Sequence, residues 1–319
     1  MDPEFYGLPP AASTFAEDVD PLFEFLWIVC GFFFLLILAI LAYSVVRYRR
    51  KRLEQPAASN VTHHTTLEIV WTLIPTVILM VVFAWGWKGN LKQSVAPPDA
   101  LRYDVQAFQW GWSIYHPGAI RGSKDIWVPA GKPVQFVMTS PDVLHSMSIP
   151  AFRAKRDVVP GSRQILWFQA TEDMVGESFR YYCTEYCGQG HSVMNGMVHV
   201  VSQAIYDTQP WAQVPEDPIE AGEYFYNTYG CSACHSSNGV AGSGPTFQNI
   251  WMREGKLSNG ENYVADEAYI KNSVRNPDSQ IVAGYPTGLM PKTWGDESGM
   301  PEADLDIIIG WMKSISEDN

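Results

Sequence analysis

Two long apolar segments lie near the start of the chain. One runs from Phe25 to Val46 and the other from Ile69 to Trp87, and neither contains a charged residue. Roughly 20 apolar residues are enough for a helix to cross the hydrocarbon core of a bilayer. Pro75 does not exclude a membrane helix, because neighbouring helices can satisfy the carbonyl that it frees. The pattern predicts two membrane-spanning helices, since the runs are too long and too uniformly apolar for a buried hairpin of a soluble protein.

Charge around these segments predicts their orientation. Residues 1–24 carry acidic side chains but no Lys or Arg, so no basic leader of a cleavable signal peptide is recognised. A basic cluster directly follows the first segment and consists of Arg47, Arg49, Arg50, Lys51 and Arg52. Because basic loops favour the cytoplasmic side, both termini and everything after about residue 90 are expected outside. This predicts a multi-pass protein of the cell membrane.

Between about residues 92 and 205 the pattern changes to short runs rich in β-branched and aromatic residues. Turn signals such as HPG, PAGKP and VPGS separate the runs. The runs themselves are RYDVQAFQW, PVQFVMTS, RQILWFQA, ESFRYYC and GMVHVVS. This arrangement predicts a small antiparallel β-sandwich.

The last hundred residues are helical in pattern and follow a proline-containing linker. Between Glu302 and Ile315, apolar residues recur at helical spacing and predict one buried face: Leu305, Ile308, Ile309 and Met312. We therefore divide the chain into an N-terminal segment with two membrane helices (1–91), a β-sandwich domain (92–205), a linker (206–218) and a C-terminal domain (219–319).

Composition narrows the possible partners and cofactors. The formal net charge of −12 argues against nucleic acid, and the charged fraction of only 18% with 12 Trp is typical of a partly membrane-embedded protein. Of the five cysteines, Cys30 lies in an apolar segment, where a small buried thiol is ordinary. The other four form two close pairs, each followed by a histidine. Outside the cytoplasm such pairs often form disulfides, but these spacings are typical of metal and haem sites.

The first pair belongs to a soft donor set. The segment CTEYCGQGHSVM contains Cys183, Cys187, His191 and Met194, and His145 stands about forty residues upstream in DVLHS. Sulfur with imidazole selects copper, and two cysteines on one loop can bridge two copper ions where a single cysteine gives a mononuclear site. A structural zinc site would not need methionine at that spacing. A copper chaperone with a CxxxC pair would not explain the histidine and methionine that follow.

This segment resembles the dinuclear CuA site of cytochrome c oxidase subunit II. All six positions of the pattern H…C-x-E-x-C-x-x-x-H-x-x-M match. The similarity extends over HSMSIPAFRAKRDVVPG, FQWGWSIY and LEIVWTLIPTVI and covers about residues 20–205. One departure is FRYYC before the first cysteine, where the family usually has a glycine, and we expect only a local change of the loop. The resemblance implies a cupredoxin-like β-sandwich.

The resemblance also implies a role for each matching residue. Cys183 and Cys187 would bridge the two copper ions. The remaining copper ligands would be His145, His191, Met194 and the backbone carbonyl of Glu185. The Glu185 carboxylate would in addition bind a Mg²⁺ or Mn²⁺ at the border with subunit I.

Two further residues acquire candidate roles from the resemblance. Trp110, in FQWGWSIY, matches the first tryptophan of the aromatic patch through which this family receives electrons, although β-sandwiches also bury Trp for packing, as we expect for Trp112. Glu68 begins the second span, where a carboxylate is costly unless it is used or solvated. In the family, a glutamate there lies at the mouth of a proton pathway into subunit I, and a simple interfacial charge is the alternative. The histidines without a matching motif are interpreted as surface or strand residues: His63, His64, His116 and His199.

The second cysteine pair forms the C-x-x-C-H motif CSACH. Cys231 and Cys234 would attach haem vinyl groups as thioethers, and His235 would be the proximal iron ligand. A redox CxxC or a zinc knuckle would not need the adjacent histidine. With AGEYFYNTYG before it and GLMPKTW after it, the region resembles an all-α class I cytochrome c. The distal ligand would then be a methionine. We expect Met290 in LMP, with Met300 in GMP as the alternative.

A subunit II fused to a cytochrome c resembles the caa-type haem–copper oxidases of bacteria. The resemblance implies that electrons pass from haem c to CuA and on to subunit I, where dioxygen is reduced to water and protons are translocated. The expected partners are oxidase subunits I and III, membrane lipid and an electron donor such as a soluble cytochrome c, another small redox protein or an upstream complex. The alternative is the electron-input subunit of a CuA-containing nitric oxide reductase. A membrane-tethered carrier working alone would leave Glu185 and Glu68 without roles.

Overall fold

The computed structural model describes residues 7–49, 61–119, 121–292, 294–295 and 299–317. Two compact units divide the chain: one comprises residues 14–95, and the other comprises residues 1–13 and 96–319. Three members of the basic cluster that predicts a cytoplasmic loop lie outside the described residues, namely Arg50, Lys51 and Arg52.

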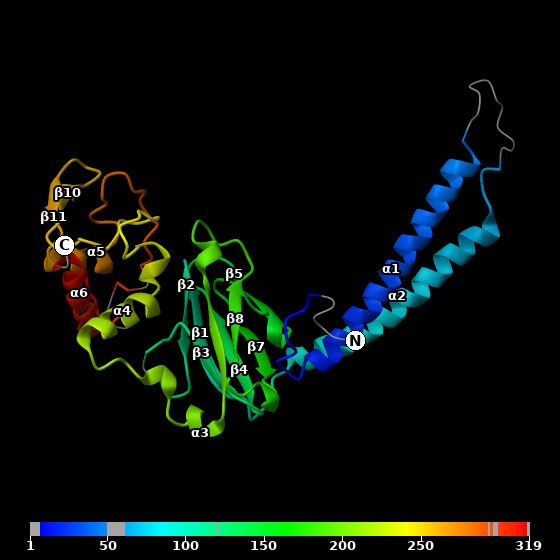
Figure 1. Ribbon diagram of the computed structural model, residues 1–319, viewed down its shortest axis with the longest axis horizontal. Coiled ribbons are helices and arrows are strands. Elements are labelled where there is room, and N and C mark those ends of the chain that lie inside the picture. Colours follow the sequence, from blue (N-terminus) through cyan, green and yellow to red (C-terminus); the bar gives the residue numbers. More distant parts are fainter. Residues whose placement is uncertain (1–6, 50–60, 120, 293, 296–298, 318–319) are drawn as a thin grey trace. The chain divides into compact units, whose positions relative to one another are not determined.

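Two long helices make up the first unit and run side by side (Figure 1). They are α1 (Ala16–Arg47) and α2 (Thr65–Ser94), and they contain the two predicted spans. Asp18 pairs with Lys92 at 2.5 Å, and the rings of Phe25 and Trp85 lie 6.0 Å apart, so the helices are antiparallel. Both are long and apolar enough to cross a membrane. Within the described part of the chain, the most apolar stretch of each helix is not buried. A buried helical hairpin would show the opposite burial.

The second unit begins with a sandwich of two sheets (Figure 1). One sheet has the order β2-β1-β4-β7 and the other the order β3-β9-β8-β5-β6. Alternate residues of the strands point inward, as Val134, Phe136 and Met138 do in β4. The strands are β1 (Leu101–Phe108), β2 (Gly111–Tyr115), β3 (Ile126–Pro129), β4 (Pro133–Thr139), β5 (His145–Ile149), β6 (Ala154–Val158), β7 (Gln164–Gln169), β8 (Ser178–Cys183) and β9 (Asn195–Val201).

The expectation of a purely antiparallel sandwich is wrong for two strand pairs. Strand β1 pairs with β4 in parallel, and β3 pairs with β9 in parallel. Between β1 and β4 the chain passes through β2 and then through β3 in the opposite sheet, so it returns beside β1 in the same direction. The segment before α1 also packs on this sandwich, because Ala12 donates to the Ala151 carbonyl and Ser13 forms a bridge with Ala170.

The regular structure in the rest of the second unit is mostly helical, and loops join its helices. Helix α3 (Gln203–Tyr206) ends where the predicted linker begins, and the linker contains a 3-10 turn (Pro210–Ala212). The helices after it are α4 (Pro218–Thr228), α5 (Glu267–Arg275) and α6 (Glu302–Glu317). A short hairpin of β10 (Glu254–Lys256) and β11 (Asn262–Val264) contradicts the all-α expectation for this region. The predicted apolar face of α6 is confirmed, because its four apolar residues are each 1–2% exposed.

Helices α4 and α6 cross at close range because a glycine lies between them. A Cβ atom at Gly222 would lie 2.3 Å from the Cβ of Trp311 and 2.9 Å from the Ile307 carbonyl oxygen. Any larger residue would push the helices apart. This contact forms one wall of an apolar core that also receives Phe225, Leu305 and Met312.

Candidate functional site

The two cysteines of the copper motif face each other at the end of a strand. Cys183 ends β8 and Cys187 lies in the following loop, and their sulfur atoms are 3.8 Å apart. A disulfide would need about 2.05 Å, and both cysteines are free. A separation of 3.8 Å allows both sulfurs to bond one metal ion, because metal–thiolate bonds are about 2.3 Å. The pair is therefore close enough for both sulfurs to bond the same metal ion.

The other predicted copper ligands surround this pair. His145, the first residue of β5, is fully buried with Nδ1 at 3.9 Å from the Cys183 sulfur. His191 Nδ1 and Met194 Sδ lie 3.5 Å and 3.7 Å from the Cys187 sulfur. The Glu185 carbonyl accepts from the Cys183 thiol at 3.2 Å, so the structure brings all six predicted copper ligands together. Among the described residues, His145, Cys183 and Cys187 form a cluster of histidine and cysteine donors that could hold a metal ion.

Electrostatics favour a thiolate in this cluster. Hydrogen bonding between the two cysteines lowers the pKa of Cys183 and raises the pKa of Cys187. Burial opposes protonation of the His145 ring, but hydrogen bonds with Asp142 and Cys183 outweigh it and raise the pKa of His145. Cys183 is therefore the cysteine that loses its proton more easily, and the thiolate is the form that binds metal.

Asp142 orients one of the candidate copper ligands and was not predicted. Its Oδ1 lies 2.9 Å from His145 Nε2, which leaves Nδ1 of that ring facing the sulfur. Its Oδ2 accepts from the Gln109 backbone N–H at 2.7 Å. A carboxylate that bonds the far nitrogen of a ligand histidine fixes the ring and its tautomer. The sequence carries one signal for this contact, because Asp142 stands three residues before His145.

Trp110 lies directly against the segment of the copper motif after β8, residues 184–194, which we call the copper loop. Gln109 and Trp110 form the turn between β1 and β2, and Trp110 is 5% exposed. The indole Nε1 of Trp110 donates to the Cys187 carbonyl at 3.0 Å, and the Gln109 side chain donates to the same oxygen at 2.6 Å. Trp112 is also buried, and its ring lies 6.0 Å from that of Tyr181 in the sandwich core. The two tryptophans therefore differ in surroundings as the sequence suggests.

The two predicted glutamates lie in different settings. Glu185 is half-buried between the cysteines, and its carboxylate is not part of the cluster among the described residues. Glu68 lies in the first turn of α2, where its carboxylate accepts from the His64 N–H at 2.9 Å. His64 Nδ1 in turn accepts from the Leu67 N–H at 3.2 Å. These reciprocal hydrogen bonds resemble a capping box and satisfy free donors at the helix start.

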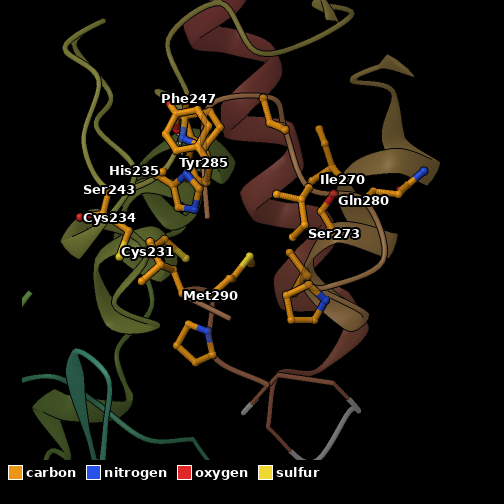
Figure 2. A pocket seen from close by; sticks show the side chains of 18 of the residues that line it. Cys231, Cys234, His235, Ser243, Phe247, Ile270, Ser273, Gln280, Tyr285 and Met290 are labelled. Atoms are coloured by element: carbon orange, nitrogen blue, oxygen red, sulfur yellow. Dashed lines mark hydrogen bonds between the residues drawn. The ribbon is translucent and has the colours of Figure 1, made fainter. Parts of the chain in front are cut away.

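The C-x-x-C-H motif opens onto a large apolar cavity (Figure 2). The cavity has about 1370 Å³ of empty space including its open mouth, and Cys231, Cys234 and His235 line one side. The Nδ1 of His235 donates to the Pro245 carbonyl at 2.7 Å, which leaves Nε2 available for iron. A Cβ at Gly244 would lie 2.5 Å from the ring, so only glycine permits this packing.

The protonation states in this cavity suit haem attachment. Burial raises the pKa of Cys231 to about 12 and that of Cys234 to about 11, so both are thiols at neutral pH. Burial lowers the pKa of His235 despite its hydrogen bond to the Pro245 carbonyl, so the ring is neutral. A neutral imidazole is the form that binds iron. The donor set and the apolar lining both fit a covalently attached haem.

The two candidate distal methionines differ in their surroundings. Met290 is half-buried, and Figure 2 shows its side chain reaching into the cavity. Met300 also touches the cavity, but it is 1% exposed within the apolar core of the C-terminal region. Its backbone carbonyl accepts from Arg275 at 2.9 Å. Met290 is thus the freer of the two side chains.

Comparisons with known proteins agree on one family. The chain matches the family models of the cytochrome c oxidase subunit II transmembrane domain over residues 3–88 and periplasmic domain over residues 108–201. A cytochrome c oxidase subunit 2 from Alkalihalophilus pseudofirmus is 27% identical over 305 residues, which cover 90% of this chain and 84% of that protein. Another from Cereibacter sphaeroides is 29% identical over 239 residues, which cover 63% and 77% of the two chains.

A solved structure is also similar to part of this chain. The periplasmic domain of cytochrome oxidase subunit II from Bradyrhizobium japonicum has 25% sequence identity and a TM-score of 0.33, and the match covers 36% of this chain and 94% of that one. The two family models together cover more than half of the 319 residues and identify α1 and α2 as membrane-spanning and the sandwich as periplasmic. The chain therefore belongs to the cytochrome c oxidase subunit II family, whose general function is electron transfer to CuA in a haem–copper oxidase.

Proposed function

We propose that this chain is the electron-input subunit of a bacterial cytochrome c oxidase that carries its own haem c. Electrons would pass from haem c to a dinuclear CuA centre and on to subunit I, where dioxygen is reduced to water and protons are translocated. The observation that carries this proposal is the position of Trp110, which contacts the copper loop and also lines the cavity of the C-x-x-C-H motif.

The copper ligands of the proposal are the residues that converge around the cysteine pair. Cys183 and Cys187 would bridge the metals, and His145, His191, Met194 and the Glu185 carbonyl would complete the set. When bound, the copper pair supplies a one-electron redox centre. The chain contributes two imidazoles, a thioether and a backbone carbonyl, each 3.2–3.9 Å from one of the two sulfurs. Holding the donors in a fixed arrangement suits electron transfer, because the centre then changes little between its two oxidation states.

The haem ligands of the proposal are His235 and Met290, with thioether bonds from Cys231 and Cys234. Histidine with methionine is the ligand pair of electron-carrying c-type cytochromes and raises the haem potential. The hydrogen bond to the Pro245 carbonyl holds the His235 ring in one orientation. The core packing of Met300 favours Met290 as the distal ligand.

Trp110 would connect the two centres. Its indole N–H bonds the carbonyl of Cys187, a candidate copper ligand, and its ring reaches the wall of the haem cavity. Gln109 bonds the same carbonyl and lines the same cavity. The β1–β2 turn thus contacts both sites. This supports electron transfer through Trp110 rather than a role in packing alone.

The remaining roles concern the complex. Glu185 would contribute its carboxylate to a Mg²⁺ or Mn²⁺ whose other ligands belong to subunit I. Glu68 would stand at a proton pathway into subunit I. We propose subunits I and III and membrane lipid as partners, with a soluble cytochrome c, another small redox protein or an upstream complex as donor.

The test is Trp110→Leu in the complex purified with its partner subunits. Haem c reoxidation, followed by rapid-mixing spectroscopy, should slow markedly while copper and haem contents stay at wild-type values. Trp167→Leu is the matched control, because Trp167 is buried on β7 opposite Gln135 and does not line the haem cavity. Unchanged reoxidation in Trp110→Leu would mean that electrons reach the copper elsewhere. Oxygen uptake by the same complex, compared with nitric oxide consumption, separates an oxidase from a nitric oxide reductase.

A further inference from the structure

A bidentate ion pair joins the sandwich to the last helix of the chain. Arg121, in the loop between β2 and β3, donates from Nε and Nη2 to the two carboxylate oxygens of Asp304 at 2.8 and 2.9 Å. Asp304 lies in the first turn of α6. The backbone bridge between Ile114 and Ser123 holds the loop two residues after Arg121. The pair therefore connects two well-fixed elements that are far apart in sequence.

The carboxylate of Asp304 is almost completely withdrawn from water. Its side chain is 1% exposed, and the Tyr229 hydroxyl donates a third hydrogen bond to it at 2.7 Å. The hydrogen bonds with Asp304 raise the pKa of Arg121, and the guanidinium also lies over the Phe225 ring at 5.8 Å. A buried carboxylate is strongly destabilising once its partner is removed. Asp304 therefore favours the one arrangement in which Arg121 faces it.

Phe108 makes a second contact across the same boundary. It ends β1, is 1% exposed and belongs to the apolar core of the C-terminal region. Its ring meets that of Trp294 edge to face with centroids 5.6 Å apart. A Cβ at Gly230, the residue before Cys231, would lie only 3.7 Å from the Phe108 ring. Trp110 follows Phe108 by two residues. This contact therefore fixes the start of the C-x-x-C-H motif, at Gly230 and Cys231, relative to Trp110.

We propose that Arg121 and Asp304 form a latch that holds the haem-binding region against the β1–β2 turn, and that Arg121 is a positioning residue for electron transfer to the copper centre. This inference rests on the proposed function, because it concerns the same electron path. Arg121 is not among the described residues that line the haem cavity, so it acts through orientation. A tether alone raises the local concentration of the haem but selects no orientation. A bidentate arginine–carboxylate pair supplies that selection.

The test is Arg121→Gln in the full chain, assembled with its partner subunits. Reoxidation of haem c through the copper centre should slow at least about tenfold, because the change leaves the buried Asp304 carboxylate without its charged partner and shifts the docked population by that order or more. Haem and copper contents, and the rate at which ascorbate reduces haem c, should stay at wild-type values. The matched control is Arg102→Gln, which removes an exposed ion pair with Asp104 on β1 and should leave reoxidation unchanged.

A wild-type rate of reoxidation in Arg121→Gln, at both low and high ionic strength, would overturn the latch. If that variant loses haem or copper, Arg121→Lys decides the question, because lysine keeps the charge but cannot form the fork. Slower reoxidation with both cofactors present then supports the latch, and an unchanged rate rejects it. A purely structural role would lower the Tm without slowing transfer at temperatures well below it.

Failure of the proposed function has a different signature. Cys187→Ser removes one sulfur bridge, so haem c in that variant should no longer be reoxidised by oxygen. Continued reoxidation at the wild-type rate would mean that electrons bypass copper, whatever the result for Arg121. Blocked reoxidation in Cys187→Ser together with a normal rate in Arg121→Gln would reject the latch alone.

Discussion

Trp110 reaches the copper loop because two glycines leave room for its ring. Gly188 has a φ of +118°, a backbone conformation that glycine adopts most easily. A Cβ at Gly190 would lie 2.6 Å from the indole of Trp110. The letters CGQGH show the glycines between Cys187 and His191, but not that they serve a side chain almost eighty residues upstream.

Gly190→Ala should therefore separate copper binding from electron transfer. The φ of Gly190 is −85°, so alanine fits the backbone and only the clash with Trp110 remains. We expect both coppers to be retained and haem c reoxidation to slow as the indole is displaced. Gly310→Ala is the matched control, because a Cβ at Gly310 meets nothing within 4 Å. Equal reoxidation rates in the two variants would contradict this account of Trp110.

The distal haem ligand can be assigned by comparing two methionines. Met290→Ala should lower the haem potential and open a position for an external ligand, because the thioether stabilises the reduced iron. Met300→Ala should instead destabilise the fold by about 2–5 kcal/mol through a cavity in the core. Redox titration and thermal unfolding of both variants distinguish these effects. A lowered potential in Met300→Ala alone would assign the ligand to Met300.

His116 should make stability depend on pH. The interpretation of this residue as a surface or strand histidine is wrong: it follows β2, is 2% exposed and stacks on Trp211 with ring centroids 4.4 Å apart. Burial lowers its pKa to about 3, whereas an unfolded chain has about 6.5. Between these values only the unfolded chain binds the proton, so stability falls as pH falls.

We expect this proton to account for about 1–2 kcal/mol of the stability lost between pH 6.5 and 5. The measurement is thermal unfolding of the purified protein at pH 7 and pH 5, compared with His116→Gln. Glutamine can still accept the hydrogen bond that the Trp127 N–H gives to the His116 ring. The variant should be less stable at pH 7 but lose less on acidification. Identical losses in both proteins would show that His116 does not titrate in this window.

At the scale of elements, the sequence predicts strands and helices whose apolar residues recur at regular spacing. It does not predict features that depend on which strands pair. The five strand runs correspond to β1, β4, β7, β8 and β9, and the apolar face of α6 is confirmed. The shorter strands were not predicted, because four or five residues between turns carry little periodicity. The parallel pairing of β1 with β4 depends on the route of the chain between the sheets, which no local pattern records.

In the candidate site, too, some residues could be predicted from the sequence and others could not. The sequence motifs predicted Cys183, Cys187, His145, His191 and Met194, and the structure brings these donors together. Other residues remained unpredicted because their partners are distant in sequence: Gln109, Phe108, Arg121 and Asp304. Asp142 is different, because it lies only three residues before His145, and its spacing was a signal that the motif analysis did not use.

The start of α2 gives a way to separate two roles of Glu68. Its carboxylate caps the helix by accepting from the His64 N–H, and a proton-pathway role would depend on its charge. Glu68→Gln keeps an acceptor oxygen but removes the charge, whereas Glu68→Ala removes both. Slower oxygen reduction in both variants, with normal haem c reduction, would support the proton pathway. Normal turnover in Glu68→Gln would leave the cap, worth about 1 kcal/mol, as its role.

At the scale of the whole molecule, the order of motifs predicts a membrane protein with its redox sites outside. A membrane-impermeant thiol reagent applied to intact spheroplasts tests this topology. Ser162→Cys, on an exposed turn of the sandwich, should be labelled, whereas Ala57→Cys, at a position between α1 and α2 in the sequence, should be labelled only after lysis. The unmodified chain gives the background from Cys30. Labelling of Ala57→Cys before lysis would reverse the predicted orientation.

Phe108 belongs to the sandwich, but its ring completes the apolar core of the C-terminal region. A cut within residues 206–218 would release a fragment with an apolar opening beside Gly230 and the C-x-x-C-H motif. The sandwich and the C-terminal region are therefore not independent modules joined only by a linker. To act as an independent electron carrier, the C-terminal region would need an apolar side chain of its own at the position that Phe108 now fills.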